Sequence, residues 1–199
     1  DICAGINTTS IIIAAGQNIK LNIIRAVSKS ASTEALMTIN PNIKSFKDLR
    51  RKTIAGPSGS TLHQLLLEAL SKNKMTIKDV NYIPMPVAET YDAMFSGKVD
   101  TALLTSTQIL SAKKRGARVL TTAKGLMCPK LVVAVSESFA KNHPDWVKRY
   151  IKVQDEAMEF IKNHKHEALQ LAAKDRGISY QDAEWLYDNT KLINTLDID

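Results

Sequence analysis

The sequence of 199 residues predicts an α/β fold in which parallel sheets carry helices on both faces. Short apolar segments rich in β-branched residues alternate with segments whose apolar residues recur every three or four positions. Glycine follows several of the latter segments, as it commonly does at the end of a helix. Residues 1–10 and 100–107 also share a pattern, which is expected when a chain contains two related lobes. The alternation excludes all-α and all-β folds, and the shared pattern favours two lobes.

The first elements are short. Ile2–Ile6 is expected to form a strand, and Thr8–Ala15 a helix that ends at Gly16. Leu21–Val27 reads as a second strand because it is rich in β-branched residues, and Ala35–Ile39 continues in extended form.

A new unit begins after Pro41. A short helix is expected after Ser45, followed by a strand at Thr53–Ala55 and a turn at Gly56–Ser60. The helix after this turn is the clearest in the chain, because its apolar residues recur at helical spacing and form one buried stripe: Leu62, Leu65, Leu66, Ala69 and Leu70.

Strands and helices continue to alternate up to residue 135, and the chain is helical from Pro144 onward. The first of these last helices carries an apolar stripe, and Ser179 with Asp182 caps the third. The remaining expected strands are Val80–Ile83, Val99–Leu104, Arg118–Leu120 and Leu131–Val135. The remaining expected helices are Val87–Phe95, Ser106–Arg115, Glu167–Arg176 and one after Pro144. The apolar stripe of the helix after Pro144 consists of Val147, Tyr150, Ile151, Met158 and Ile161.

Composition places the chain among ordinary folded proteins, with 44% hydrophobic and 24% charged residues. No apolar run approaches the roughly 20 residues that a bilayer span needs. The net charge of +7 is distributed over short clusters at expected helix ends, such as Lys47–Lys52 and Lys113–Arg115. No aromatic residues are interleaved with these clusters, so a nucleic-acid partner is not expected. A weak attraction for anionic ligands remains consistent with the charge.

The cysteines and histidines predict no metal site. Cys3 and Cys128 are far apart and belong to no C-x-x-C motif, and no carboxylate set completes coordination by the histidines. We expect two free, mostly buried thiols.

Longer phrases carry a resemblance to a known family. Residues 43–70 (IKSFKDLRRKTIAGPSGSTLHQLLLEAL), 88–109 (AETYDAMFSGKVDTALLTSTQI) and 116–122 (GARVLTT) resemble the second lobe of ABC-importer solute-binding proteins. The group they resemble takes aliphatic sulfonates, taurine, nitrate and thiamine-pyrimidine precursors. Residues 1–24 (DICAGINTTSIIIAAGQNIKLNII) resemble the end of that family's first lobe.

The resemblance implies a two-lobed, periplasmic-binding-protein-like fold. Residues 1–38 would be the C-terminal part of lobe I, 39–123 lobe II, and 124–199 a return crossing with C-terminal helices that pack on lobe I. The opening units of lobe I would be missing before Asp1, which would leave that lobe with an unpaired sheet edge and exposed apolar helix faces.

The implied function is that of a binding protein rather than an enzyme. The chain would capture a small polar or anionic organic molecule between its lobes and deliver it to the permease subunits of an ABC importer, without a cofactor. It would act in the periplasm or at the extracellular face of the membrane. Membrane association would arise only through the permease or through a lipid anchor outside this sequence.

Candidate ligand-binding residues lie on loops that precede helices. The turn before the clearest helix supplies backbone amides without intrahelical partners, and these amides are able to bind an anion or a polar head group. The two segments of the internal similarity supply small donors and acceptors. For the hydroxyl and amide side chains, helix capping is the alternative role. The candidates are Ser58, Gly59, Ser60, Thr61 and His63 on the first loop, and Asn7, Thr8, Thr9, Thr105, Ser106 and Thr107 on the two similar segments.

Two other functions stay open at this point. The first is a ligand-sensing domain of a regulator, which shares the two-lobed architecture. The second is thiamine-pyrimidine biosynthesis, whose enzymes resemble this family but use a Cys-rich motif that is absent here. The sequence also lacks a G-x-S-x-G elbow, a phosphate-binding loop with its lysine and a G-x-G-x-x-G fingerprint.

Overall fold

The computed structural model describes residues 1–193 and divides the chain into two compact units. Unit 1 joins residues 1–29 to the chain from residue 129 onward, and unit 2 comprises residues 30–128. The expected lobe boundaries fell after residues 38 and 123, so both differ from the observed divisions. The last six residues of the expected segment 124–199 lie outside the described part of the chain.

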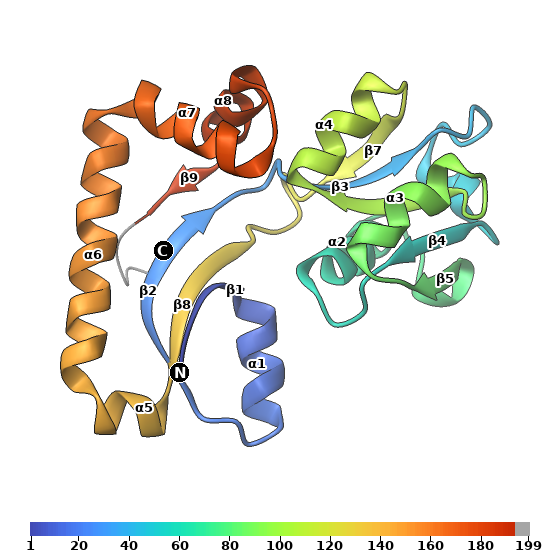
Figure 1. The fold of residues 1–199 in the computed structure, drawn as a ribbon. Helices are drawn as coiled ribbons and strands as arrows, with labels where there is room; N and C mark the ends of the chain where they lie inside the picture. The colour runs from blue at the N-terminus through green and yellow to red at the C-terminus, as the bar shows by residue number, and fades with distance from the viewer. Residues whose placement is uncertain (194–199) are drawn as a thin grey trace. The chain divides into compact units, whose positions relative to one another are not determined.

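The sheet of unit 1 has the order β1-β8-β2-β9, and its pairs are antiparallel. Its strands are β1 (Ile2–Asn7), β2 (Leu21–Lys29), β8 (Lys130–Ser136) and β9 (Lys191–Leu192). The expectation of parallel strands is therefore wrong for this unit. The reason is the path of the chain, which leaves unit 1 through β2 and returns through the adjacent β8 in the opposite direction (Figure 1).

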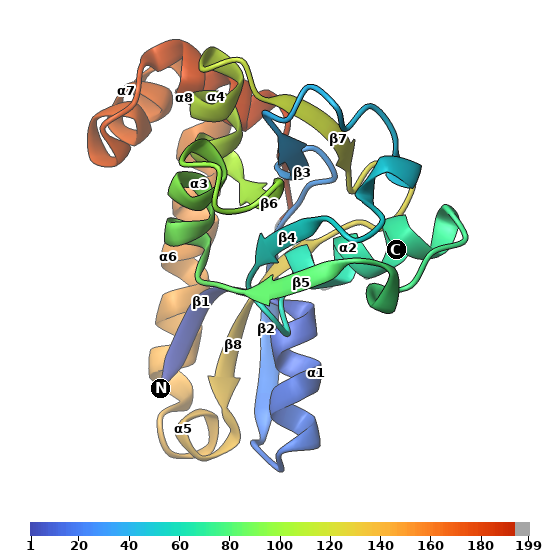
Figure 2. The same ribbon diagram turned by 90° about the vertical axis from the view of Figure 1, so that its right-hand side faces the viewer.

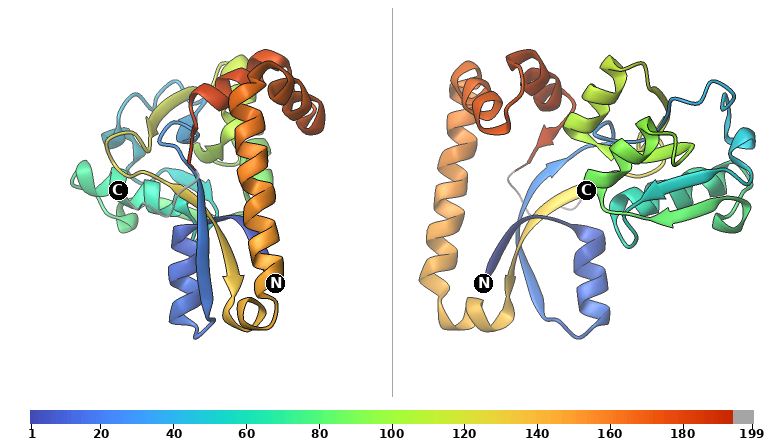
Figure 3. Two further views of the ribbon diagram at one scale, coloured as in Figure 1. Left: turned by 90° about the vertical axis from the view of Figure 1, so that its left-hand side faces the viewer. Right: turned by 45° about the vertical axis from the view of Figure 1, so that its right-hand side comes forward.

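Helices flank this sheet on both sides, with α1 (Thr8–Gly16) on one side and α6 (Pro144–Asn163) on the other (Figure 3). Arg25 on β2 joins the sheet to α6 through two contacts of 2.7 Å from its Nη2 to the carboxylate oxygens of Asp155. Among the described side chains of α1 and α6, none is fully buried. Ile12 on α1 is 71% exposed. Unit 1 thus leaves apolar helix surface uncovered.

The other helices of unit 1 follow β8 and α6. They are α5 (Glu137–Asn142), α7 (Lys165–Arg176) and α8 (Tyr180–Asp188). Pro144 begins α6, where its missing N–H is not needed, and Gly177 ends α7 in the left-handed conformation.

The sheet of unit 2 has the order β5-β4-β6-β3-β7. Its parallel part consists of β4 (Thr53–Gly56), β5 (Asn81–Pro84) and β6 (Thr101–Thr105), as the sequence predicts. In contrast, β3 (Glu34–Thr38) runs antiparallel to both β6 and β7 (Arg118–Thr122). The segment that forms β3 was expected at the end of lobe I, but it pairs within the sheet of unit 2.

Helices cover both faces of this sheet, because successive residues of a strand point to opposite faces. On β3, Leu36 packs in the same cluster as α2 (Thr61–Lys72), whereas Met37 packs with α3 (Val87–Phe95) and α4 (Ser106–Lys114). In the view of Figure 2, α2 lies behind β4. The short helices η1 (Phe46–Leu49) and η2 (Ile77–Asp79) complete the unit.

At the edge of the sheet where β6 begins, the carboxylate of Asp100 joins neighbouring segments. It accepts hydrogen bonds from the backbone N–H and the hydroxyl of Thr53, at 3.0 and 2.9 Å, and from the amide of Asn40 at 3.0 Å. Burial, the largest influence, acts to raise the pKa of Asp100, but these hydrogen bonds and the charge of Lys52 together lower it. Asp100 therefore has a structural role at the entry to β6.

Within residues 1–193, no helix combines the length and the apolar composition that a membrane span requires.

Candidate functional site

The candidate residues of unit 2 gather at the opposite edge of its sheet, where β4, β5 and β6 end. Because these strands are parallel, α2, α3 and α4 all begin at this edge. The antiparallel strand β3 starts there as well, and its first residue, Glu34, pairs with Thr105 at the end of β6. In sheets of this kind, ligands bind outside the carboxyl ends of the strands.

The turn before α2 is held by its own hydroxyl groups. Ser60 is the N-cap of the helix, since its Oγ accepts a hydrogen bond from the backbone N–H of His63 at 3.3 Å. The same Oγ donates its proton to the carbonyl oxygen of Pro57 at 2.7 Å. Gly59 has a φ of +68°, a conformation that glycine adopts without strain. Capping, the alternative role that the sequence left open, is therefore what the structure shows for Ser60.

His63 lies against Tyr82, with ring centroids 4.7 Å apart and an interplanar angle of 6°. Its Nδ1 accepts a hydrogen bond from the backbone N–H of Gly59 at 3.3 Å, which places the ring proton on Nε2. Burial lowers the pKa of His63 below its ordinary value, which favours the neutral form of the ring. Tyr82 donates in turn to the carbonyl oxygen of Gly56 at 2.7 Å. This pair of rings fixes the shape of the turn.

The second loop joins β6 to α4. Thr105 is the N-cap residue of α4, but among the described residues its side chain makes no capping hydrogen bond. Ser106 has a φ of +43°, in the left-handed region that costs a non-glycine residue about 1–3 kcal/mol. Its backbone N–H donates to the carbonyl oxygen of Thr33 at 2.9 Å. Thr107 follows in the first turn of α4 and is half-buried.

The remaining candidates, Asn7, Thr8 and Thr9, belong to unit 1, where α1 begins. Asn7 is the N-cap of this helix, and its Oδ1 accepts a hydrogen bond from the backbone N–H of Ser10 at 2.8 Å. The internal similarity of the sequence thus corresponds to two strand-to-helix loops, of which only the one at Asn7 has a side-chain cap within the described residues.

Sequence reasoning missed Glu34. Its Oε1 accepts a hydrogen bond of 2.5 Å from the hydroxyl of Thr61, while its Oε2 is buried and has no partner among residues 1–193. Burial raises the pKa of Glu34, and the hydrogen bond from Thr61 opposes this effect. The signal in the sequence is weak, because Glu34 appears only as an acidic residue after a short polar segment and lies far along the chain from Thr61.

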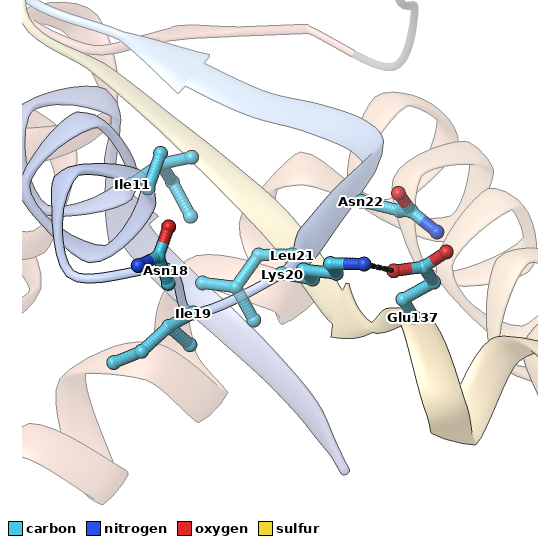
Figure 4. Close-up of a pocket in the computed structure, with 8 residues that line it drawn as sticks. Ile11, Asn18, Ile19, Lys20, Leu21, Asn22 and Glu137 are labelled. Carbon is cyan, nitrogen blue, oxygen red and sulfur yellow. Dashed lines mark ion pairs between the residues drawn. The ribbon is translucent and has the colours of Figure 1, made fainter.

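A separate cavity of about 380 Å³ lies in unit 1, and none of the candidate residues lines it (Figure 4). Lys20 and Glu137 form an ion pair of 3.7 Å at this cavity, and both side chains are largely exposed. Its lining consists of Ile11, Ala15, Asn18, Ile19, Lys20, Leu21, Asn22 and Glu137.

The structure shows no group of metal-ligating side chains among residues 1–193. Cys3 and Cys128 are both free and exposed, so the expectation of buried thiols is wrong. Cys3 lies on β1, which pairs only with β8 among the described strands, and the next residues, Ala4 and Gly5, are exposed as well.

Comparison with known sequences places the chain in a family. Residues 4–168 match the family described as NMT1/THI5 like. A putative aliphatic sulfonates-binding protein of Bacillus subtilis (strain 168) is 29% identical over 164 residues, which cover 81% of this chain and 49% of that protein. The taurine-binding periplasmic protein of Escherichia coli (strain K12) is 28% identical over 158 residues, covering 77% of this chain and 49% of that protein. The chain therefore spans about half the length of these relatives.

Solved structures show the same fold at low sequence identity. The periplasmic aliphatic sulphonate binding protein SsuA of Escherichia coli superposes with a TM-score of 0.80 at 20% identity, covering 97% of this chain and 64% of that one. The alkanesulfonate-binding protein SsuA of Xanthomonas axonopodis pv. citri, bound to MOPS, gives 0.85 at 19% identity, with coverages of 97% and 68%. The desulfurization enzyme DSZB gives 0.77 at 14% identity, with coverages of 98% and 73%. The chain belongs to the NMT1/THI5-like family and has the periplasmic-binding-protein fold.

Proposed function

We propose that this chain belongs to the solute-binding component of an ABC importer, which captures a small polar or anionic organic molecule and delivers it to the membrane permease. The observation that carries this proposal is one edge of the sheet of unit 2. The parallel neighbours β4 and β6 both end there, so the helices that follow them, α2 and α4, both begin there. The relatives named above are binding proteins for sulfonates and taurine, which supports a solute of this size and charge.

In this proposal, the solute contacts come from loops rather than from strands. The backbone amides of Thr61 and Leu62 lie in the first turn of α2. The N–H groups of a first turn have no carbonyl oxygen within the helix to which they can donate. Such amides, together with the positive end of the helix dipole, bind an oxyanion. We assign ligand contacts to the turn Ser58–Thr61, to His63 and to the loop Thr105–Thr107, and a second set of contacts to Asn7, Thr8 and Thr9 of unit 1.

We also propose that unit 1 corresponds to lobe I and unit 2 to lobe II of the whole protein, and that the protein works outside the cytoplasm, as its periplasmic relatives do. Its partners would be the solute and the permease subunits, with no nucleic acid involved. Delivery by such a protein depends on a higher affinity of the solute for one conformational state than for another.

The solute is expected to leave unchanged, because the chain acts as a binding protein rather than as an enzyme. The fold alone does not carry this point, since a desulfurization enzyme shares it. The names of the curated relatives support it, because they are binding proteins.

A thermal-shift screen with alkanesulfonates, inorganic oxyanions and pyrimidines tests the proposal. A true ligand at 100 times its Kd stabilises the folded state by about 2.7 kcal/mol, which raises the Tm measurably. Mass spectrometry of the ligand after prolonged incubation then tests whether it is unchanged. A Tm that responds to no class of compound would contradict solute binding, and a converted ligand would contradict the non-enzymatic role.

A further inference from the structure

The positive charge of unit 2 is concentrated at one edge of its sheet, the edge where β4, β5 and β6 begin and where α2, α3 and α4 end. Every lysine and arginine of unit 2 except Lys124 lies on segments at this edge. All of these side chains are exposed apart from the half-buried Lys52. We call this surface the basic edge and define it as the lysines and arginines of residues 44–52, 72–78, 98 and 113–118.

Hydrogen bonds hold these segments beside one another. The backbone N–H of Arg51, before β4, donates to the carbonyl oxygen of Asp79, before β5, at 2.8 Å. The carboxylate of Asp100 joins the beginning of β6 to the beginning of β4. Arg118, at the beginning of β7, donates from its Nη2 to the carbonyl oxygen of Asn40 at 2.6 Å. The charged segments therefore form one continuous surface, although they are far apart in the sequence.

Carboxylates at the basic edge do not balance this charge. Asp48, Asp79 and Asp100 lie on its segments, and each accepts a hydrogen bond from a backbone N–H group of unit 2. Glu68 and Asp92 are exposed about one helical turn before the ends of α2 and α3. Lysines and arginines outnumber these five carboxylates by more than two to one, so the edge carries a net positive charge.

The kind of basic residue indicates the kind of anion. An arginine binds a single phosphate through two parallel hydrogen bonds, but three of the four arginines here already have partners within the protein. Arg50 pairs with Asp79, Arg118 donates to backbone carbonyl oxygens, and the guanidinium of Arg115 lies 3.7 Å from the ring centroid of Phe95. The remaining charge belongs mainly to lysines, which are hydrated point charges on flexible stems. Such charges, distributed over several segments, attract an extended anionic surface.

We propose that the basic edge of unit 2 binds reversibly to an anionic membrane surface through phospholipid headgroups. Clusters of four to eight lysines and arginines are typical of such binding. Adsorbed in this way, unit 2 keeps the loops of its candidate solute site, at the opposite edge of the same sheet, open to solution. The contact is ionic and shallow, so the protein leaves the surface again for the permease. The inference goes beyond the proposed function and does not require that a solute binds.

Co-sedimentation of the 199-residue chain with lipid vesicles tests the proposal. We expect vesicles of equal parts phosphatidylglycerol and phosphatidylcholine to bind it at least about tenfold more strongly than vesicles of phosphatidylcholine alone. This difference should disappear at high salt, because the screening length falls from about 10 Å at 0.1 M to about 3 Å at 1 M. Both readings use the unmodified protein and do not depend on the folding of a variant.

A variant with four lysines of the basic edge replaced by glutamine locates the contact. Each charge near an anionic surface contributes about fivefold to binding, and only some of the four face the lipid at one time, so we expect binding to weaken by at least about tenfold. The matched control removes the same charge from exposed lysines of unit 1 and should weaken binding by less than about threefold. The variant changes Lys47, Lys72, Lys78 and Lys98, and the control changes Lys141, Lys162, Lys174 and Lys191.

Circular dichroism of both variants confirms that they are folded. Equal binding of the unmodified chain to both kinds of vesicle, or to neither, would overturn the proposal. An equal loss in the variant and the control would overturn it too, because the net charge rather than the basic edge would then be responsible. Binding to polyglutamate but not to vesicles would overturn it in favour of an acidic protein partner. The solute screen succeeds or fails separately, since it concerns the opposite edge.

Discussion

The imidazole of His63 and the phenol ring of Tyr82 lie nearly parallel, 4.7 Å apart between centroids. One ring stands in the first turn of α2 and the other on β5, so the stack joins two neighbouring strand-to-helix units. The ring of Tyr82 covers one face of the imidazole, and the Nδ1 of His63 accepts a hydrogen bond from the backbone N–H of Gly59. The turn Gly56–Thr61 is therefore held by side chains, independently of any ligand.

Replacing Tyr82 by Leu should raise the pKa of His63 toward its ordinary value of 6.5, because removal of the ring admits water to the imidazole. NMR titration of the His63 ring protons measures this change, and Tyr91→Leu, which alters a tyrosine packed against Phe95, is the control. In the unmodified protein the pKa of folded His63 is lowered, so stability should decrease as the pH falls below 6.5. An unchanged His63 pKa in Tyr82→Leu would show that the stack does not bury the ring.

Replacing Gly56 by Ala should destabilise unit 2 by about 1–3 kcal/mol through overpacking. A Cβ at this position would lie 2.4 Å from the Cδ1 and 3.0 Å from the Cβ of Leu103 on β6. Gly16→Ala is the control, because a Cβ there meets no atom within 4 Å. Urea denaturation followed by circular dichroism measures the difference. A cost no greater than that of the control would mean that β4 and β6 are not in such close contact.

Replacing Asp100 by Asn should lower the free energy of unfolding by roughly 2 kcal/mol, because hydrogen bonds to a charged acceptor are lost. Asp92→Asn, at an exposed position, should have little effect.

The lowered pKa of Asp100 also predicts a pH dependence of the free energy of unfolding. Its stabilisation is complete above the ordinary value of 3.8 and is lost as the pH falls through the folded-state pKa. Urea denaturation between pH 2 and 6 should show a smaller acid loss for Asp100→Asn; equal losses would contradict this role.

Replacing Ser106 by Gly should raise stability by about 1 kcal/mol, because glycine adopts a φ of +43° without strain. If the hydroxyl of Ser106 contacts the solute, the same variant should bind it more weakly. Ser111→Gly, in the interior of α4, is the control and should lower stability. A Ser106→Gly variant that is less stable than the unmodified protein would contradict the inferred strain.

The sequence predicted local structure well where apolar residues at a regular spacing mark the buried face of a helix. The stripe in α2 is an example, since Leu62, Leu65 and Leu66 are all buried as their spacing requires. Sequence reasoning missed α5, η2 and β9, because they are too short to show a period. It also gave the wrong strand direction in unit 1, because periodicity within a strand carries no information about its neighbour.

In the candidate site too, the local pattern of the sequence does not show which distant segments come together. Loops before helices could be recognised from Gly59 and from the hydroxyl residues around it. The pairing of Glu34 with Thr105 and its bond to Thr61 could not, because they depend on the position of β3 in the sheet. The exposure of Cys3 could not be predicted either, because it depends on how the strands and helices of unit 1 pack.

Amide chemical-shift mapping of a solute identified by thermal shift tests the central claim most directly. The account predicts that the backbone amides of Thr61 and Leu62 and those of the loop Thr105–Thr107 shift together and saturate at one concentration. Simultaneous substitution of Thr105 and Thr107 by Ala should weaken this binding by about 1–3 kcal/mol while the amide spectrum of the remaining protein is retained. Shifts confined to the cavity of unit 1, around Ile11 and Lys20, would contradict the claim that the solute binds where α2 and α4 begin.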